Sequence, residues 1–378
     1  DSAWGDRALA HALTDELPRQ GFRLTNPAAF VAAQPPAADV EIDEGPDGEG
    51  TSWSCAHGVG RWLRDCGCRV GRGKNGEQAW RAPLRAAVHL LRDGAAAFFE
   101  EEAGELLVDP WAARDEYIHV LLDPDVESRR ALLGRHGKGA VEGGGAVRAL
   151  ELLELQHQVM LASTSCGWFF DDIAGLEARQ VLRYVARAGE LWEAIGGSAP
   201  WNELRQILGE ARSRLTPANT GADILDSVRL ADRLDDRVLV AHVIMRAARP
   251  ELGAPERLAG HRVDVEIEAS GTTRTHVALE GERTGRRYSA WVEHVTDEAS
   301  GQAFRVREDA ADTPAGAESE ELTLADLLQG GGHELLEEVL AADIEQARRQ
   351  TVARRRGWRH LAITGGAVEP GLPPGAAS

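Results

Sequence analysis

The sequence has few lysines and methionines and no long apolar run. Lys74 and Lys138 are the only lysines among the 42 Lys and Arg residues. No segment reaches the roughly 18 consecutive apolar residues of a transmembrane helix, and the start of the chain lacks the basic residues and apolar core of a signal peptide. We therefore expect a cytoplasmic protein with no membrane partner.

Net positive charge is also absent. The chain carries 61 Asp and Glu against 42 Lys and Arg, which gives a formal net charge of -19. Proteins that bind nucleic acid or anionic lipid draw much of their affinity from clustered basic side chains. The composition therefore predicts neither nucleic acid nor a lipid surface as a partner.

Cysteine is too scarce for a disulfide scaffold in a chain of 378 residues, so the thiols are expected to be reduced or to form a site. The cysteines are Cys55, Cys66, Cys68 and Cys166. The chain starts at Asp1, and its only methionines are Met160 and Met245. We therefore expect it to be the C-terminal part of a longer product.

The hydrophobic pattern predicts a mainly α fold class. At about 100 to 200 residues per domain, the length allows two or three domains. Changes of pattern divide the chain into an α/β-like piece at 1–50, a helical bundle at 51–250, a small antiparallel β domain at 251–310, a linker with a C-terminal helix at 311–363, and a disordered tail at 364–378.

Residues 4–50 combine a short helical pattern, which Gly21 ends, with the extended alternation of Val40 and Ile42. This piece is too short to bury a core of its own. We expect it to be the last part of a domain whose larger part lies upstream of Asp1.

Residues 53–249 follow a helical period. Helices are predicted at 83–107, 111–122, 124–135 and 147–161, with Asp123 as the N-cap of the third. Three more apolar stripes cover 181–195, 201–215 and 224–245, and they place Trp192 and Trp201 in the core. Together these stripes predict a helical bundle.

After Pro250 the apolar residues alternate as they do in strands. Three such runs, at 263–267, 275–279 and 288–292, are separated by turns at 270–271 and 281–285. They predict a small antiparallel sheet. A polar linker at 308–321 then leads to a helix that Thr323 caps.

Two short segments hold most of the side chains that could carry chemistry. Residues 51–85 combine tryptophan, histidine, aspartate and cysteine among many glycines, and residues 163–172 place Gly167 and two aspartates beside aromatic rings. Zinc could bind the Cys55 and His57 pair together with Cys66 and Cys68, with Cys166 in reserve, although both one-residue spacings depart from the usual two to four.

Two other mechanisms are open for the same residues. A cysteine nucleophile with His57 as its base would need an electropositive thiol, which Arg61 and Arg64 could provide. Carbohydrate binding would stack tryptophan faces on sugar rings while Asp and His side chains bond to hydroxyl groups. The residues suited to carbohydrate are Trp53, His57, Trp62, Asp65, Trp168 and Asp171.

Four strings of uncommon residues resemble a known family. They are TSWSCAHGVGRW (51–62), DCGC (65–68), QAWRAPLR (78–85) and TSCGWFFDDI (164–173). They are similar to the C-terminal domain of unknown function (3536) that is attached to glycoside hydrolase family 57 catalytic domains in bacteria. The resemblance covers about residues 8 to 190.

The resemblance implies a fold and an activity. Family 57 enzymes join a β/α barrel of fewer than eight strands to a helical domain that closes over the active site, and they act on α-glucans with retention. Residues 9–42 would be the closing part of that barrel, and Trp53 and Trp168 would line sugar subsites. This chain departs from the branching-enzyme members at two places. It has residues 54–57 where those members carry a glycine-rich run, and Gly167 where they carry an Asp directly before the second Trp.

The catalytic carboxylates of the family lie in barrel motifs that this chain lacks, so no catalytic residue is assigned. We predict the C-terminal portion of a family 57-like enzyme acting on α-glucans, inactive alone, with no cofactor and with the upstream barrel and an α-glucan as partners. Its six substrate-cleft residues would be the set suited to carbohydrate. The alternative is a noncatalytic, zinc-stabilised interaction module.

Overall fold

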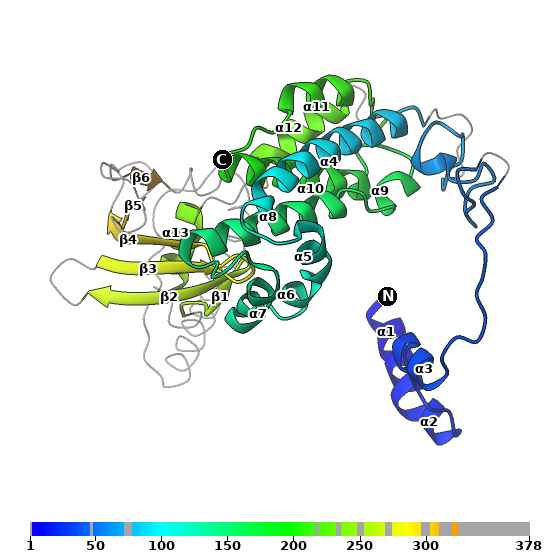
Figure 1. Ribbon diagram of the computed structural model, residues 1–378, viewed down its shortest axis with the longest axis horizontal. Coiled ribbons are helices and arrows are strands. Elements are labelled where there is room, and N and C mark those ends of the chain that lie inside the picture. The colour runs from blue at the N-terminus through cyan, green and yellow to red at the C-terminus, as the bar shows by residue number, and fades with distance from the viewer. Residues whose placement is uncertain are drawn as a thin grey trace, which may run out of the picture. The chain divides into compact units, whose positions relative to one another are not determined.

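A computed structural model describes residues 2–45, 48–71, 78–215, 219–231, 236–247, 253–268, 274–295, 303–309 and 320–323. Within these residues the chain is mostly helical, with a small antiparallel sheet near its C-terminal end, as the sequence predicts (Figure 1). The predicted C-terminal helix after Thr323 and the tail at 364–378 lie outside the described residues. No helix in the described part of the chain is both long and apolar enough to cross a membrane.

The N-terminal segment contains α1 (Ser2–His11), a π-helical turn (Ala12–Glu16), α2 (Leu17–Arg19) and α3 (Pro27–Ala33). Gly21 follows α2 with a left-handed φ of 86°, a conformation that glycine adopts without strain. Asn26 begins α3, since its side chain accepts a hydrogen bond from the amide of Ala29 at 2.8 Å. The residues from Val40 to Ile42 form no strand, so the barrel piece expected here is not seen.

The helices of the body are α4 (Arg81–Gly104), α5 (Pro110–Glu116), α6 (Ile118–Leu122), α7 (Val126–His136), α8 (Gly143–Leu161), α9 (Cys166–Phe169), α10 (Leu176–Ala194), α11 (Trp201–Leu208), α12 (Gly221–Ala231) and α13 (Asp236–Ala247). The predicted helices are confirmed in place. Some details of the prediction were wrong. The single helix expected at 111–122 is divided into α5 and α6. Asp125, and not Asp123, caps α7; the stripe at 201–215 is helical only to Leu208; and the stripe at 224–245 belongs to two helices.

Helix α10 packs against α8 and α12, and α4 packs against α8 and α11 (Figure 1). Their shared core includes Trp80, Phe99, Trp168 and Trp192. The helices approach closely because glycines make room for the indole rings. A Cβ atom on Gly189 would lie only 2.2 Å from the ring of Trp201, so this position accepts no side chain without a shift.

The sheet is an antiparallel meander in the order β1 to β6. Its strands are β1 (Arg257–Leu258), β2 (His261–Glu268), β3 (Arg274–Gly281), β4 (Arg287–Val295), β5 (Ala303–Glu308) and β6 (Glu320–Thr323). The predicted alternation is confirmed in β3, where every second residue is buried. Helix α13 covers the buried face, and Val240 and Val243 share a core there with Val277 and Leu279. This core is separate from that of the helical bundle.

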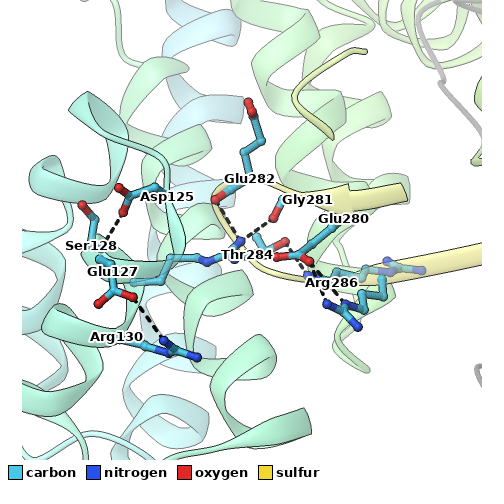
Figure 2. A network of polar contacts seen from close by, with 11 residues as sticks. Asp125, Glu127, Ser128, Arg130, Glu280, Gly281, Glu282, Thr284 and Arg286 are labelled. Atoms are coloured by element: carbon cyan, nitrogen blue, oxygen red, sulfur yellow. Dashed lines mark hydrogen bonds and ion pairs between the residues drawn. The ribbon is translucent and has the colours of Figure 1, made fainter. Parts of the chain in front are cut away.

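Arg129 of α7 fastens the turn between β3 and β4 to the helical body. Its guanidinium is buried and donates hydrogen bonds to the carbonyl oxygens of Gly281 at 2.7 Å and Glu282 at 2.9 Å. It also forms an ion pair with Glu280 at 2.6 Å. Figure 2 shows these hairpin residues facing the first turn of α7, where Asp125 bonds to Ser128. The sheet therefore joins the bundle through a buried polar contact.

Candidate functional site

The residues predicted as metal ligands come together in the structure. The sulfur atoms of Cys55, Cys66 and Cys68 and one imidazole nitrogen of His57 all lie within 4.8 Å of one another. We call these four residues the Cys/His cluster. Cys55 is buried, Cys66 and Cys68 are half-buried, and His57 is exposed. None of the four cysteines of the chain forms a disulfide, and Cys166 is exposed and outside the cluster.

Two tight turns present the ligands. In the first, the hydroxyl of Ser52 donates to the carbonyl of Gly58 at 3.0 Å, and Gly58 has a φ of 65°. In the second, Gly67 lies between the two cysteines with a φ of 72°, and its amide donates to the carboxylate of Asp65 at 3.1 Å. A left-handed glycine in each turn reverses the chain sharply. This explains how a one-residue spacing brings both thiols to one place.

Arg81 lies beside the second turn and is fully buried. Its guanidinium donates to the sulfur of Cys66 at 3.8 Å and to the carbonyl of Cys68 at 3.0 Å. Burial lowers the pKa of Arg81, while the neighbouring Cys66 acts in the opposite direction. The sequence showed no sign of this residue's role, because burial of an arginine depends on contacts made across the fold.

The segment that follows the 3₁₀ turn at Gly60–Trp62 is held against the residues around α9. The carboxylate of Asp171 accepts hydrogen bonds from the amides of Val70 at 2.9 Å and Gly71 at 2.7 Å. The indole of Trp62 donates to the carbonyl of Ser165 at 2.9 Å. Asp171 and Trp62 therefore fix the course of the chain, which also leaves them less free to bind a ligand.

Trp53 and Trp168, the two predicted sugar platforms, differ completely in exposure. Trp53 is 93 % exposed, whereas Trp168 is 0 % exposed. The indole of Trp168 donates to the carbonyl of Arg81 at 3.1 Å, and the guanidinium of Arg85 lies 3.7 Å above its ring. A sugar could stack on Trp168 only if Arg85 moved away. The six residues named for a substrate cleft stay a prediction.

Asp172, which the sequence analysis did not single out as a ligand, has the densest set of hydrogen bonds in this region. One oxygen accepts from the amide of Ala174 and the hydroxyl of Ser213, both at 2.8 Å. The other accepts from the amides of Arg214 at 2.7 Å and Leu215 at 3.2 Å. The buried carboxylate thus ties together two loops that are far apart in sequence. Both members of the Asp171 and Asp172 pair hold backbone amides.

A comparison with protein families finds a match over the helical body. The model of a domain of unknown function (DUF3536) matches residues 77–293, which is more than half of the chain. The chain belongs to the DUF3536 family. No curated protein and no solved structure matches it.

The DUF3536 match confirms the resemblance at the level of that domain. It begins just before Trp80 and Arg81, includes every helix from α4 to α13, and ends within β4. The helical body and the first strands of the sheet are therefore the part common to the family. The Cys/His cluster and Trp53 precede the matched residues.

Proposed function

We propose that this DUF3536 chain is the noncatalytic C-terminal portion of a glycoside hydrolase family 57-like enzyme that acts on α-glucans. In this proposal the N-terminal segment closes an upstream β/α barrel, and the helical body helps to form the substrate cleft. Family membership and the four sequence strings that resemble family 57-associated proteins support it.

The observation that carries the proposal is the unburied N-terminal segment. No residue from Gly5 to Gly45 whose side chain is described is buried. The segment nevertheless holds large apolar side chains, and Val40 is 89 % and Ile42 78 % exposed. Phe22, Leu24 and Phe30 are exposed as well. Exposed apolar side chains favour burial against a further protein surface, at about 25 cal/mol per Å².

Trp53 offers a second argument for a glucan ligand. The indole of Trp53 has 93 % of its surface exposed to solvent, and an exposed indole is a side chain that sugar rings stack on. It follows the N-terminal segment directly, so it would lie close to the edge of the proposed barrel. The two catalytic carboxylates would come from that barrel, because none is assigned in this chain.

The test uses the whole product of the gene. We expect the reading frame upstream of Asp1 to encode a barrel with a pair of catalytic carboxylates, and the whole protein to cleave or transfer maltooligosaccharides. Trp53→Ala should lower kcat/KM for long maltooligosaccharides by about tenfold, because stacking is lost in the transition state. Hydrogen exchange in the whole protein should show protected amides at residues 9–42.

Leu122→Ala is the matched control, since Leu122 is also a highly exposed apolar residue but lies on α6. It should leave the kinetics unchanged. A gene product without a barrel, or a Trp53→Ala enzyme with unchanged kinetics on every glucan, would contradict the proposal.

A further inference from the structure

We propose that Cys55, His57, Cys66 and Cys68 bind one structural Zn²⁺ ion. The inference rests on the geometry of the Cys/His cluster and does not depend on the proposed action on glucans. Zinc binding is one of the three mechanisms that the sequence left open, and the structure gives it a defined set of four ligands. A structural zinc ion at this place does not require the chain to be an interaction module.

The distances suit a single tetrahedral ion. With bonds of about 2.3 Å to sulfur and about 2.0 Å to nitrogen, the donor atoms of a tetrahedral zinc site lie about 3.5 to 3.8 Å apart. The four donor atoms of the cluster are already within 4.8 Å of one another. The side chains therefore need to move by only about an ångström to close around the ion.

The type of ligand selects the metal and its role. Three thiolates and one imidazole are a soft donor set that favours Zn²⁺ over Mg²⁺ or Ca²⁺, which prefer oxygen. Four protein ligands fill a tetrahedral site and leave no position for water or substrate. The ion would therefore hold the two turns together and would not act as a Lewis acid.

Arg81 completes the charge balance. Zn²⁺ with three thiolates and a neutral imidazole has a net charge of one negative unit, which is costly to bury alone. The buried guanidinium of Arg81 supplies one positive charge and already donates to the sulfur of Cys66. Hydrogen bonds from the surrounding protein to ligand atoms are a regular feature of zinc sites. This contact lies where a zinc thiolate would need it.

The first experiment measures zinc in the whole chain, purified in reducing buffer without a histidine tag. We expect one zinc per chain by mass spectrometry of the metal. Cys66→Ser and Cys68→Ser should each lower the zinc content at least severalfold. Cys166→Ser is the matched control, because its thiol is exposed and outside the cluster, and it should retain the full content.

A second measurement keeps the proposal testable if the serine variants fail to fold. Co²⁺ replacing Zn²⁺ in the unaltered chain should give the visible absorption of tetrahedral cobalt bound to thiolate. His57→Cys should keep the metal, since it replaces one zinc ligand by another. The proposal is overturned if the folded chain takes up no zinc from an equimolar Zn²⁺ solution, or if zinc remains in the Cys66→Ser/Cys68→Ser double variant.

Discussion

At the scale of the residue, Gly167 departs from a family pattern, and the packing of two helices explains the departure. The sequence comparison with branching enzymes expects an Asp directly before Trp168, and this chain has glycine there. A Cβ atom at position 167 would lie 2.3 Å from Cγ2 of Val181 on α10. Because α9 presses against α10 at this point, the position has no room for any side chain.

Gly167→Ala is therefore expected to destabilise the chain by about 1 to 3 kcal/mol, since overpacking forces the helices apart. Urea unfolding would measure the change. The control is Gly144→Ala, where the added Cβ meets nothing within 4 Å and where alanine favours the helix α8. Gly167→Ala combined with Val181→Ala should recover part of the loss, and equal stability of the two single variants would refute the packing argument.

At the scale of the element, α7 shows what a helix start requires. The side chain of Asp125 accepts a hydrogen bond from the amide of Ser128 at 2.7 Å. That backbone hydrogen bond is the first cause of the lowered pKa of Asp125, and burial acts against it. The charged form of the cap therefore stabilises the helix, and it does so only while the carboxyl group is ionised.

Asp125→Ala is expected to lower Tm by a few degrees at pH 7, measured by circular dichroism. Because the folded pKa is depressed, the contribution is complete above the ordinary aspartate pKa of about 4 and is lost as the pH falls through the lower folded value. The difference in Tm between variant and parent should thus shrink in acid. Asp123→Ala serves as the control, and a larger effect at Asp123 would restore the cap expected from the sequence.

The pattern of apolar residues predicted the helices and strands well, because the spacing of apolar residues is a local property of the sequence. It failed where a long-range contact decides the end of an element. Leu215 continues the stripe of α11 but lies in a loop, where its amide and that of Arg214 bond to Asp172. This carboxylate lies more than forty positions earlier in the chain. No local pattern contains that information.

Part of the candidate site could be predicted from the sequence and part could not. The cysteines and histidine could be chosen from the sequence, because few residue types bind zinc and all four lie within fourteen positions. Their approach in space could not be predicted, since the one-residue spacings work only with the left-handed turns at Gly58 and Gly67. Nor could the full burial of Trp168, which depends on the placement of Arg85 and Arg81.

At the scale of the whole molecule, the buried Arg129 is one of the contacts that couple the sheet to the bundle. Arg283 of the same hairpin pairs with Glu154 of α8 at 3.1 Å, and Arg286 pairs with Glu151 at 3.8 Å. Arg129 supplies every hydrogen bond described above between α7 and the hairpin.

The partners of Arg129 include two backbone carbonyls: that of Gly281, which also accepts from the amide of Gly285 at 2.7 Å, and that of Glu282, for which Arg129 is the donor. Glu280 adds a charge whose pKa is lowered, although burial pulls it upward, because Arg129 and Arg287 donate to it.

Arg129→Ala should therefore cost about 1 to 3 kcal/mol, since it removes the buried donor to the carbonyl of Glu282 and one of the two arginine partners of the half-buried Glu280. We expect the sheet to unfold before the bundle, which limited proteolysis between α12 and β4 would reveal as a stable helical fragment. Arg130→Ala removes an exposed neighbour in an i,i+3 ion pair and should have almost no effect. A single cooperative transition in Arg129→Ala would argue against this coupling role.

The meander order of the sheet also bears on how the family region behaves when it is separated from the rest. The family match ends at Glu293, yet β4 extends to Val295 and pairs with β5 from Ala290 onward. A fragment that stops at residue 293 would present β4 as an open edge, with unpaired amides and carbonyls beside the apolar Val292. Such fragments are expected to polymerise edge to edge, with the missing β5 replaced by a strand of the next molecule.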